Sequence, residues 1–176
     1  MNLPAMNRRS ALVGMYRLGS GAVTALALTA CGFKLRASQD FAFSSLAVTP
    51  QPGGPLAIEL GRSFGSAVRV LRPEETLSEA QIVVEILQEQ REKVVVGVNS
   101  SGQVREFQLR IRLKFRVRNA QGQELVAPVE IVQQRDISFN ESAVLAKEAE
   151  EVLLYRDMQS DIVQQLLRRL AAVRPV

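Results

Sequence analysis

The stretch from Arg105 to Arg118 constrains the fold more than any other part of the sequence. Apolar residues alternate with polar or charged ones along these 14 positions. Successive side chains of a β-strand point to opposite faces of a sheet, so a period of two residues predicts a long strand with one buried and one polar face. The apolar side of this strand comprises Phe107, Leu109, Ile111, Leu113, Phe115 and Val117.

The neighbouring segments predict two further strands that pair with it through hairpins. Residues 81–98 also alternate, and residues 125–137 form the returning strand. The two connections, residues 99–102 and 119–122, each begin with Asn and end with Gly, which is typical of turns. Pro128 lies inside the third strand and has no N–H to donate, so this strand is expected at an edge of the sheet.

Two helices and a short strand complete the predicted fold. The strand covers Phe43 to Val48, and a first helix begins at Pro55 and ends by Arg72, because the residue before Pro73 disfavours helical backbone. The apolar face of this helix is expected to comprise Ala57, Leu60, Phe64, Val68 and Leu71. A long helix runs from about Ser142 to Val173, with acidic residues in its first half and arginines at its end. The sequence therefore predicts an α+β fold with two helices on one face of a mostly antiparallel sheet of about four strands.

The first 30 residues have the features of a signal peptide. A leader with three arginines and no acid precedes an apolar run at residues 18–30, which is too short to span a membrane because about 20 apolar residues are needed. The tetrapeptide Leu28-Thr29-Ala30-Cys31 resembles the lipobox of bacterial lipoproteins. This resemblance implies cleavage before Cys31 and attachment of acyl chains to it, which would give a stable membrane anchor. An ordinary core cysteine is the alternative interpretation.

The mature protein is therefore expected to be residues 31–176, a single domain that begins with a short tether. Gly32 stands where bacterial sorting reads an aspartate as a signal to stay in the inner membrane, so the outer membrane is the expected destination. The pair Arg8-Arg9 leaves the export route open between the general secretory and the twin-arginine pathway.

Composition excludes several classes of function. The predicted leader holds three of the 22 basic residues and none of the 18 acidic ones, so 19 basic residues face 18 acidic ones in the remainder. A net charge of about +1 does not indicate a nucleic-acid-binding protein. The sequence has no histidine, which removes the commonest metal ligand and the Ser-His-Asp and Cys-His nucleophile systems. We predict a protein without catalytic activity, metal or cofactor; a carboxylate hydrolase is the remaining enzymatic alternative.

The polar face of the central strand carries a row of five cations. A hairpin that pairs Val98 with Gln103 would place Glu89 opposite Arg112 and Glu85 opposite Arg116. A second hairpin that pairs Arg118 with Glu124 would give Arg112 a second acid, Glu130. The cations in the row are Arg110, Arg112, Lys114, Arg116 and Arg118.

This register leaves Arg110 and Lys114 without an opposing acid and places Arg91 beside Arg110. Cations that cluster without acids are sites where an anionic ligand would reduce repulsion. We therefore predict that Arg91, Arg110 and Lys114 contact phosphates of a glycolipid. The alternatives are a solvated face, or a face turned toward a partner protein.

Three parts of the sequence carry a resemblance to a known family. They are residues 31–36, residues 99–109, and residues 135–140, the last leading into 145–148 and 154–158. In their order along the chain, they resemble the LptE family of lipopolysaccharide-assembly lipoproteins. The resemblance implies a non-catalytic partner of the outer-membrane barrel LptD that plugs the barrel, helps it to assemble and binds lipopolysaccharide during delivery to the outer leaflet. A rival interpretation is a lipid-anchored periplasmic auxiliary subunit of another envelope lipid transporter.

Overall fold

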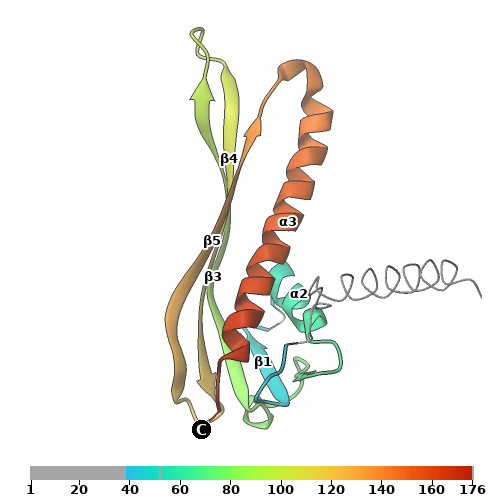
Figure 1. The fold of residues 1–176 in the computed structure, drawn as a ribbon, viewed down its shortest axis with the longest axis vertical. Coiled ribbons are helices and arrows are strands. Elements are labelled where there is room, and N and C mark those ends of the chain that lie inside the picture. Colours follow the sequence, from blue (N-terminus) through green and yellow to red (C-terminus); the bar gives the residue numbers. More distant parts are fainter. Residues whose placement is uncertain (1–38, 52, 176) are drawn as a thin grey trace, which may run out of the picture. The chain divides into compact units, whose positions relative to one another are not determined.

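The computed structural model describes residues 39–51 and 53–175, and the predicted leader and Cys31 lie outside them. The described chain forms five strands, two α-helices and two short 3₁₀ turns (Figure 1). The strands are β1 (Ser45–Thr49), β2 (Arg69–Val70), β3 (Ile82–Val98), β4 (Val104–Asn119) and β5 (Glu124–Ser138). The helices are α2 (Pro55–Ser63) and α3 (Val144–Ala171), and the 3₁₀ turns are Leu77–Glu79 and Glu141–Ala143.

All five strands belong to one sheet in the order β2-β1-β3-β4-β5. Strands β3, β4 and β5 form an antiparallel meander, whereas β1 runs parallel to both of its neighbours. The predicted α+β class and the mostly antiparallel sheet are confirmed, with β2 as one strand more than expected. The position of β5 at an edge, predicted from Pro128, is also confirmed.

The first helix is shorter than predicted. It ends at Ser63, and Gly65 follows with φ +55°, a left-handed conformation that glycine adopts without steric penalty. The prediction that Val68 and Leu71 continue the helical face is wrong. Both side chains are buried, but they flank β2, because the chain turns back beside β1. Val68 packs into the core beneath the helices, whereas Leu71 packs with Val83 on the other face of the sheet. Spacing alone could not separate one helical face from two residues that are buried on opposite faces of a sheet.

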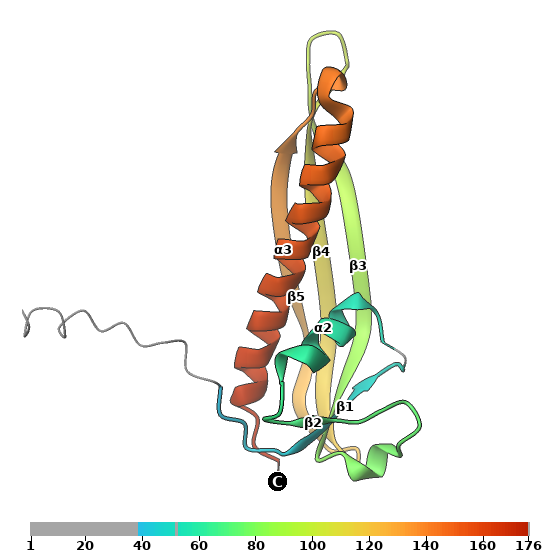
Figure 2. The same cartoon turned by 90° about the vertical axis from the view of Figure 1, so that its right-hand side faces the viewer.

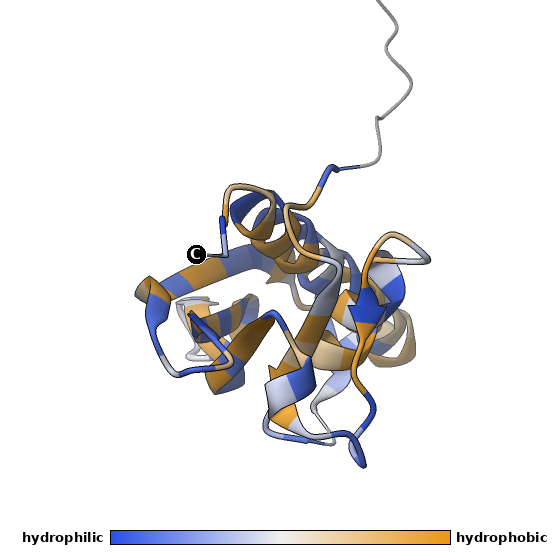
Figure 3. Cartoon of the chain, turned by 90° about the horizontal axis from the view of Figure 1, so that it is seen from below, coloured by the Kyte–Doolittle hydropathy of each residue, from blue (hydrophilic) through white to orange (hydrophobic). Residues whose placement is uncertain are grey.

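Helices α2 and α3 pack on the same face of the sheet, as predicted (Figures 1 and 2). The apolar side of β4 is buried against them, and its residues from Leu109 to Val117 are at most 1% exposed. Seen from below, apolar and polar bands alternate along the strands (Figure 3). Helix α3 has 28 residues, so it extends about 42 Å along the sheet.

The two ends of the domain differ in burial. We call the end that holds β1, β2 and α2 the basal end, and the end that holds the β3–β4 turn and the first turns of α3 the distal end (Figure 1). The fully buried residues of α3 all lie in its second half, from Met158 to Leu170. At the distal end Leu145 is 82% exposed and Val98 is 60% exposed. The hydrophobic core therefore lies mainly at the basal end.

Candidate functional site

The face of the sheet opposite the helices carries the charged side chains of β4. Because side chains alternate along a strand, burial of Leu109 to Val117 against the helices directs the intervening cations to the other face. Neither α2 nor α3 covers that face (Figure 2). Near the basal end it is partly covered by the segment after β2, where Leu71 and Ala80 pack on Val83. We call the five cations of this face the basic stripe: Arg110, Arg112, Lys114, Arg116 and Arg118.

The register of β3 against β4 is as predicted at the basal end and differs beyond it. Glu85 pairs with Arg116, as predicted, and an irregularity then follows at Leu87, between Ile86 and Gln88. A β-bulge inserts one residue into one strand only. Every later side chain of that strand therefore lies on the opposite face from the one that regular alternation predicts. From this point Gln90 lies opposite Arg112.

Two predicted pairings are wrong because of this bulge. Glu89 does not face Arg112, and Arg91 does not lie beside Arg110. Glu92 takes the position opposite Arg110. The distal half of β3 therefore supplies the basic stripe with an acid where sequence reasoning had placed a like charge.

The second hairpin shows the same kind of shift. Arg118 pairs with Glu124, as predicted, but irregularities on both sides of Val117 shift the later pairing by two residues in total. Glu130 lies opposite Lys114 and not opposite Arg112. The prediction that Lys114 has no acid across the sheet is therefore wrong, although no ion pair of Lys114 is formed within the described residues.

Arg91 lies on the helix face of the sheet, away from the basic stripe. Its guanidinium donates a hydrogen bond to Gln159 of α3 and lies 5.7 Å from the ring centroid of Tyr155. The Tyr155 hydroxyl donates to the backbone carbonyl of Glu92 at 2.7 Å. Of the three predicted ligand-contacting residues, the structure brings Arg110 and Lys114 onto one face and separates Arg91 from them.

At the basal end of the stripe, one carboxylate accepts hydrogen bonds from two cations. Arg116 and Arg118 each donate an Nε hydrogen bond to a different oxygen of Glu85. The hydrogen bond from Arg118, followed by that from Arg116, holds the pKa of Glu85 below its ordinary value against the opposing effect of burial.

At the distal end of the stripe the contacts are looser. Glu92 lies between Arg110 and Arg112, with N···O distances of 3.5 and 3.7 Å, longer than a normal hydrogen bond. Arg110 donates instead to Gln108 at 2.6 Å. The Nε of Arg112 is buried and has no acceptor. This part of the stripe retains positive charge that the sheet itself does not neutralise.

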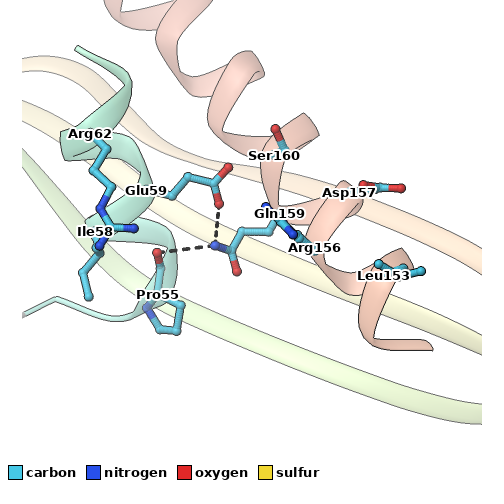
Figure 4. A pocket seen from close by; sticks show the side chains of 9 residues that line it. All are labelled: Pro55, Ile58, Glu59, Arg62, Leu153, Arg156, Asp157, Gln159 and Ser160. Atoms are coloured by element: carbon cyan, nitrogen blue, oxygen red, sulfur yellow. Dashed lines mark hydrogen bonds between the residues drawn. The ribbon is translucent and has the colours of Figure 1, made fainter. Parts of the chain in front are cut away.

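A second candidate site is the groove of about 790 Å³ between α2 and α3 (Figure 4). Gln159 spans it by donating from Nε2 to Glu59 and to the backbone carbonyl of Pro55. Arg62 and Arg156 line its walls without an ion pair in the described part of the chain. The sequence analysis missed this groove because Glu59 and Gln159 are 100 positions apart, and no local pattern signals their contact.

Residues 39–51 and 53–175 contain no group of three or more His, Cys, Asp or Glu side chains able to hold a metal ion. Within the same residues no helix combines the length and the apolar character needed to cross a membrane.

The fold belongs to a class of small bacterial lipoprotein domains with known structures. It is similar to the solution structure of lipoprotein B from Nitrosomonas europaea, with a TM-score of 0.68, 34% identity and coverage of 80% of this chain and 91% of that one. The crystal structure of rare lipoprotein B from Shewanella oneidensis shares the fold, with a TM-score of 0.61, 18% identity and coverage of 73% and 95%.

The sequence match assigns the family within this class. The model of the LptE lipopolysaccharide-assembly family matches residues 40–170, which include every strand and helix of the described chain except the last residue of α3. The chain belongs to the LptE family. It is also 25% identical over 153 residues to the LPS-assembly lipoprotein LptE of Pectobacterium atrosepticum, covering 81% of this chain and 78% of that protein. The resemblance drawn from the sequence is confirmed.

Proposed function

We propose that this chain is a non-catalytic outer-membrane lipoprotein that plugs an LptD-type barrel, helps it to assemble and binds lipopolysaccharide during delivery to the outer leaflet. The observation that carries the proposal is the family match across residues 40–170. A sheet face rich in charged side chains suits the wet interior of a large barrel.

Cys31 is the proposed point of attachment to the outer membrane. It is the only cysteine of the chain and it ends the lipobox-like sequence. Radioactive palmitate should be incorporated into the wild-type chain and not into the Cys31→Ser variant, and the mature protein should begin at residue 31. Incorporation into the variant would contradict this assignment.

Arg110 and Lys114 are the proposed contacts to lipopolysaccharide phosphates, because both lie on the uncovered face of the sheet. Arg91, the third residue of the original prediction, lies on the opposite face and is bound to Gln159. The glycolipid contact proposed here therefore omits Arg91.

Copurification tests the proposed function. The full-length chain with a C-terminal tag is purified from outer membranes in mild detergent, and copurifying molecules are identified by mass spectrometry. We expect an LptD-type barrel in an equimolar amount together with lipopolysaccharide. Recovery of inner-membrane transporter subunits in place of a barrel would contradict the proposal and favour the role of auxiliary subunit in another lipid transporter.

A further inference from the structure

The cations of the basic stripe are not equally available to a ligand. Arg116 and Arg118 are both hydrogen-bonded to Glu85, so an incoming anion must compete with an existing carboxylate. Arg112 and Lys114 make no side-chain hydrogen bond within the described residues. An anion that binds this second pair breaks no hydrogen bond of the protein.

Of these two side chains, Arg112 lacks a hydrogen-bond partner at a buried donor. Its Nε–H is buried without an acceptor, and its one ion-pair contact is at 3.7 Å to Glu92, which it shares with Arg110. A buried donor without an acceptor destabilises a protein, and a guanidinium binds a phosphate through two parallel hydrogen bonds. The side chain is 35% exposed, so a ligand can reach it from solvent.

Lys114 lies two residues further along the same face, about 6.6 Å away along the strand. The side chains of Arg and Lys are long enough to converge over that distance on one phosphate group. The neighbours of Lys114 across the sheet are Gln88 on β3 and Glu130 on β5. Glu130 is the acid that competes with a ligand for Lys114.

An apolar side chain lies beside this pair. Val132 of β5 is opposite Arg112 and is 43% exposed. A bare inorganic ion would leave Val132 in water, whereas the apolar part of an amphiphile would cover it.

We propose that Arg112 and Lys114 form an anion subsite that binds a phosphate monoester of an amphiphile, with Val132 against its apolar part. The subsite deepens the lipopolysaccharide contact of the proposed function and rests on it. It shifts the centre of that contact from Arg110 to Arg112, because Arg110 already donates to Gln108.

Binding of phosphorylated lipid A to the purified full-length protein in nonionic detergent tests the subsite. The double variant Arg112→Gln/Lys114→Gln should lose about tenfold or more in affinity, as expected for the loss of charge-assisted hydrogen bonds. The matched control is Arg116→Gln/Arg118→Gln, which removes the same charge from the same strand face and should lose no more than about threefold. Equal losses in the two variants would overturn the subsite, since the stripe would then act only as a general positive field.

Two further measurements identify the phosphate and its source. Lipid A from which the phosphates have been removed should bind the wild-type protein and the Arg112/Lys114 double variant equally weakly. Inorganic phosphate at millimolar concentration should not displace lipid A; displacement would show a simple phosphate site and overturn the role of Val132. The variant Glu130→Gln should bind phosphorylated lipid A more tightly than wild type, and unchanged affinity would contradict the proposed position of the phosphate.

Failure of the subsite can be separated from failure of the proposed function. The Arg112/Lys114 double variant should melt at the temperature of the wild-type protein and still copurify with the barrel. A wild-type protein that copurifies with the barrel but binds phosphorylated and dephosphorylated lipid A equally would overturn the subsite alone. A wild-type protein that brings down no barrel would overturn the proposed function, whatever its affinity for lipid A.

Discussion

The basal end of the domain is stabilised by burial, whereas the distal end is stabilised by polar contacts between α3 and β3. At the basal end the second half of α3 packs Ile162, Leu166 and Leu170 into the core. At the distal end the first half of the helix contacts the sheet through Lys93 and Glu151, 2.5 Å apart. One helix thus makes two kinds of contact with one sheet.

Because of this difference, the basal end contributes most of the stability, whereas the distal end offers most of the surface available for binding. Burial of apolar surface is the main favourable contribution to folding, and it is concentrated where α2 and β1 add to the core. The distal half of the sheet leaves its open face uncovered, and the part of the basic stripe with the longer ion-pair distances lies there. Changes to that face can therefore alter ligand contact with little effect on folding.

The largest expected effect comes from truncating one leucine at each end of α3. Leu166→Ala should lower the free energy of unfolding by about 2–5 kcal/mol, because it leaves a cavity in the basal core. Leu145→Ala on the same helix should change it by less than about 0.5 kcal/mol, because Leu145 is 82% exposed. Urea denaturation of both variants measures the difference. Similar losses in the two variants would mean that the core extends to the distal end.

The next largest effect is expected from removing the charge of each of the two carboxylates that pair with the basic stripe. Glu85→Gln should lower the free energy of unfolding at pH 7 by about 1–2 kcal/mol, because Glu85 is hydrogen-bonded to both Arg116 and Arg118. Glu92→Gln should cost less than about 1 kcal/mol, because its ion pairs are longer. The matched substitutions remove one charge each at equal shape. A larger loss for Glu92→Gln would show that the distal contacts are the tighter ones.

Glu85 also predicts a dependence of stability on pH. The pKa of Glu85 in the folded protein lies below its ordinary value of 4.5. Its contribution to stability is therefore complete above about pH 4.5 and is lost as the pH falls through the lower, folded-state pKa. The difference in unfolding free energy between wild type and Glu85→Gln should shrink as the pH is lowered from 5 toward 2. A difference that stays constant over this range would contradict the assigned cause.

Sequence patterns alone predicted the meander but not the placement of Arg91. The strand β4 alternates strongly, and turns that begin with Asn and end with Gly bound it, so its faces and its neighbours follow from local sequence. The residues after the bulge at Leu87 are Gln88, Glu89, Gln90, Arg91 and Glu92, so both faces of this part of the strand are polar. A slip of one residue then exposes no apolar side chain, and the hydrophobic pattern carries no signal that fixes the register.

The contacts that place Arg91 are also non-local. Its hydrogen bond to Gln159 joins residues 68 positions apart, and the stacking on Tyr155 depends on how α3 lies along the sheet. The missed end of α2 is different, since Gly65 was a visible signal. Val68 and Leu71 concealed it because they flank β2 and are buried at spacings that also fit a helix.

The smallest expected effect is local and lies at the distal end. Lys93 is paired with Glu151, and its Nζ lies 4.5 Å from the ring centroid of Phe107. Lys93→Met keeps the apolar stem and removes the charge, so the free energy of unfolding should fall by about 0.5–1 kcal/mol. Amide hydrogen exchange should become faster for residues 94–98, because local opening there no longer has to break the ion pair.

Basal amides in the same sample serve as the internal control. Val83 and Val84 are fully buried within β3, and their exchange requires opening of the core. Their exchange should change only by the small loss in global stability, so the two ends of one strand should respond differently to a single substitution. Equal acceleration at both ends would mean that the domain opens as one unit, and that the distal face cannot rearrange around a ligand independently of the core.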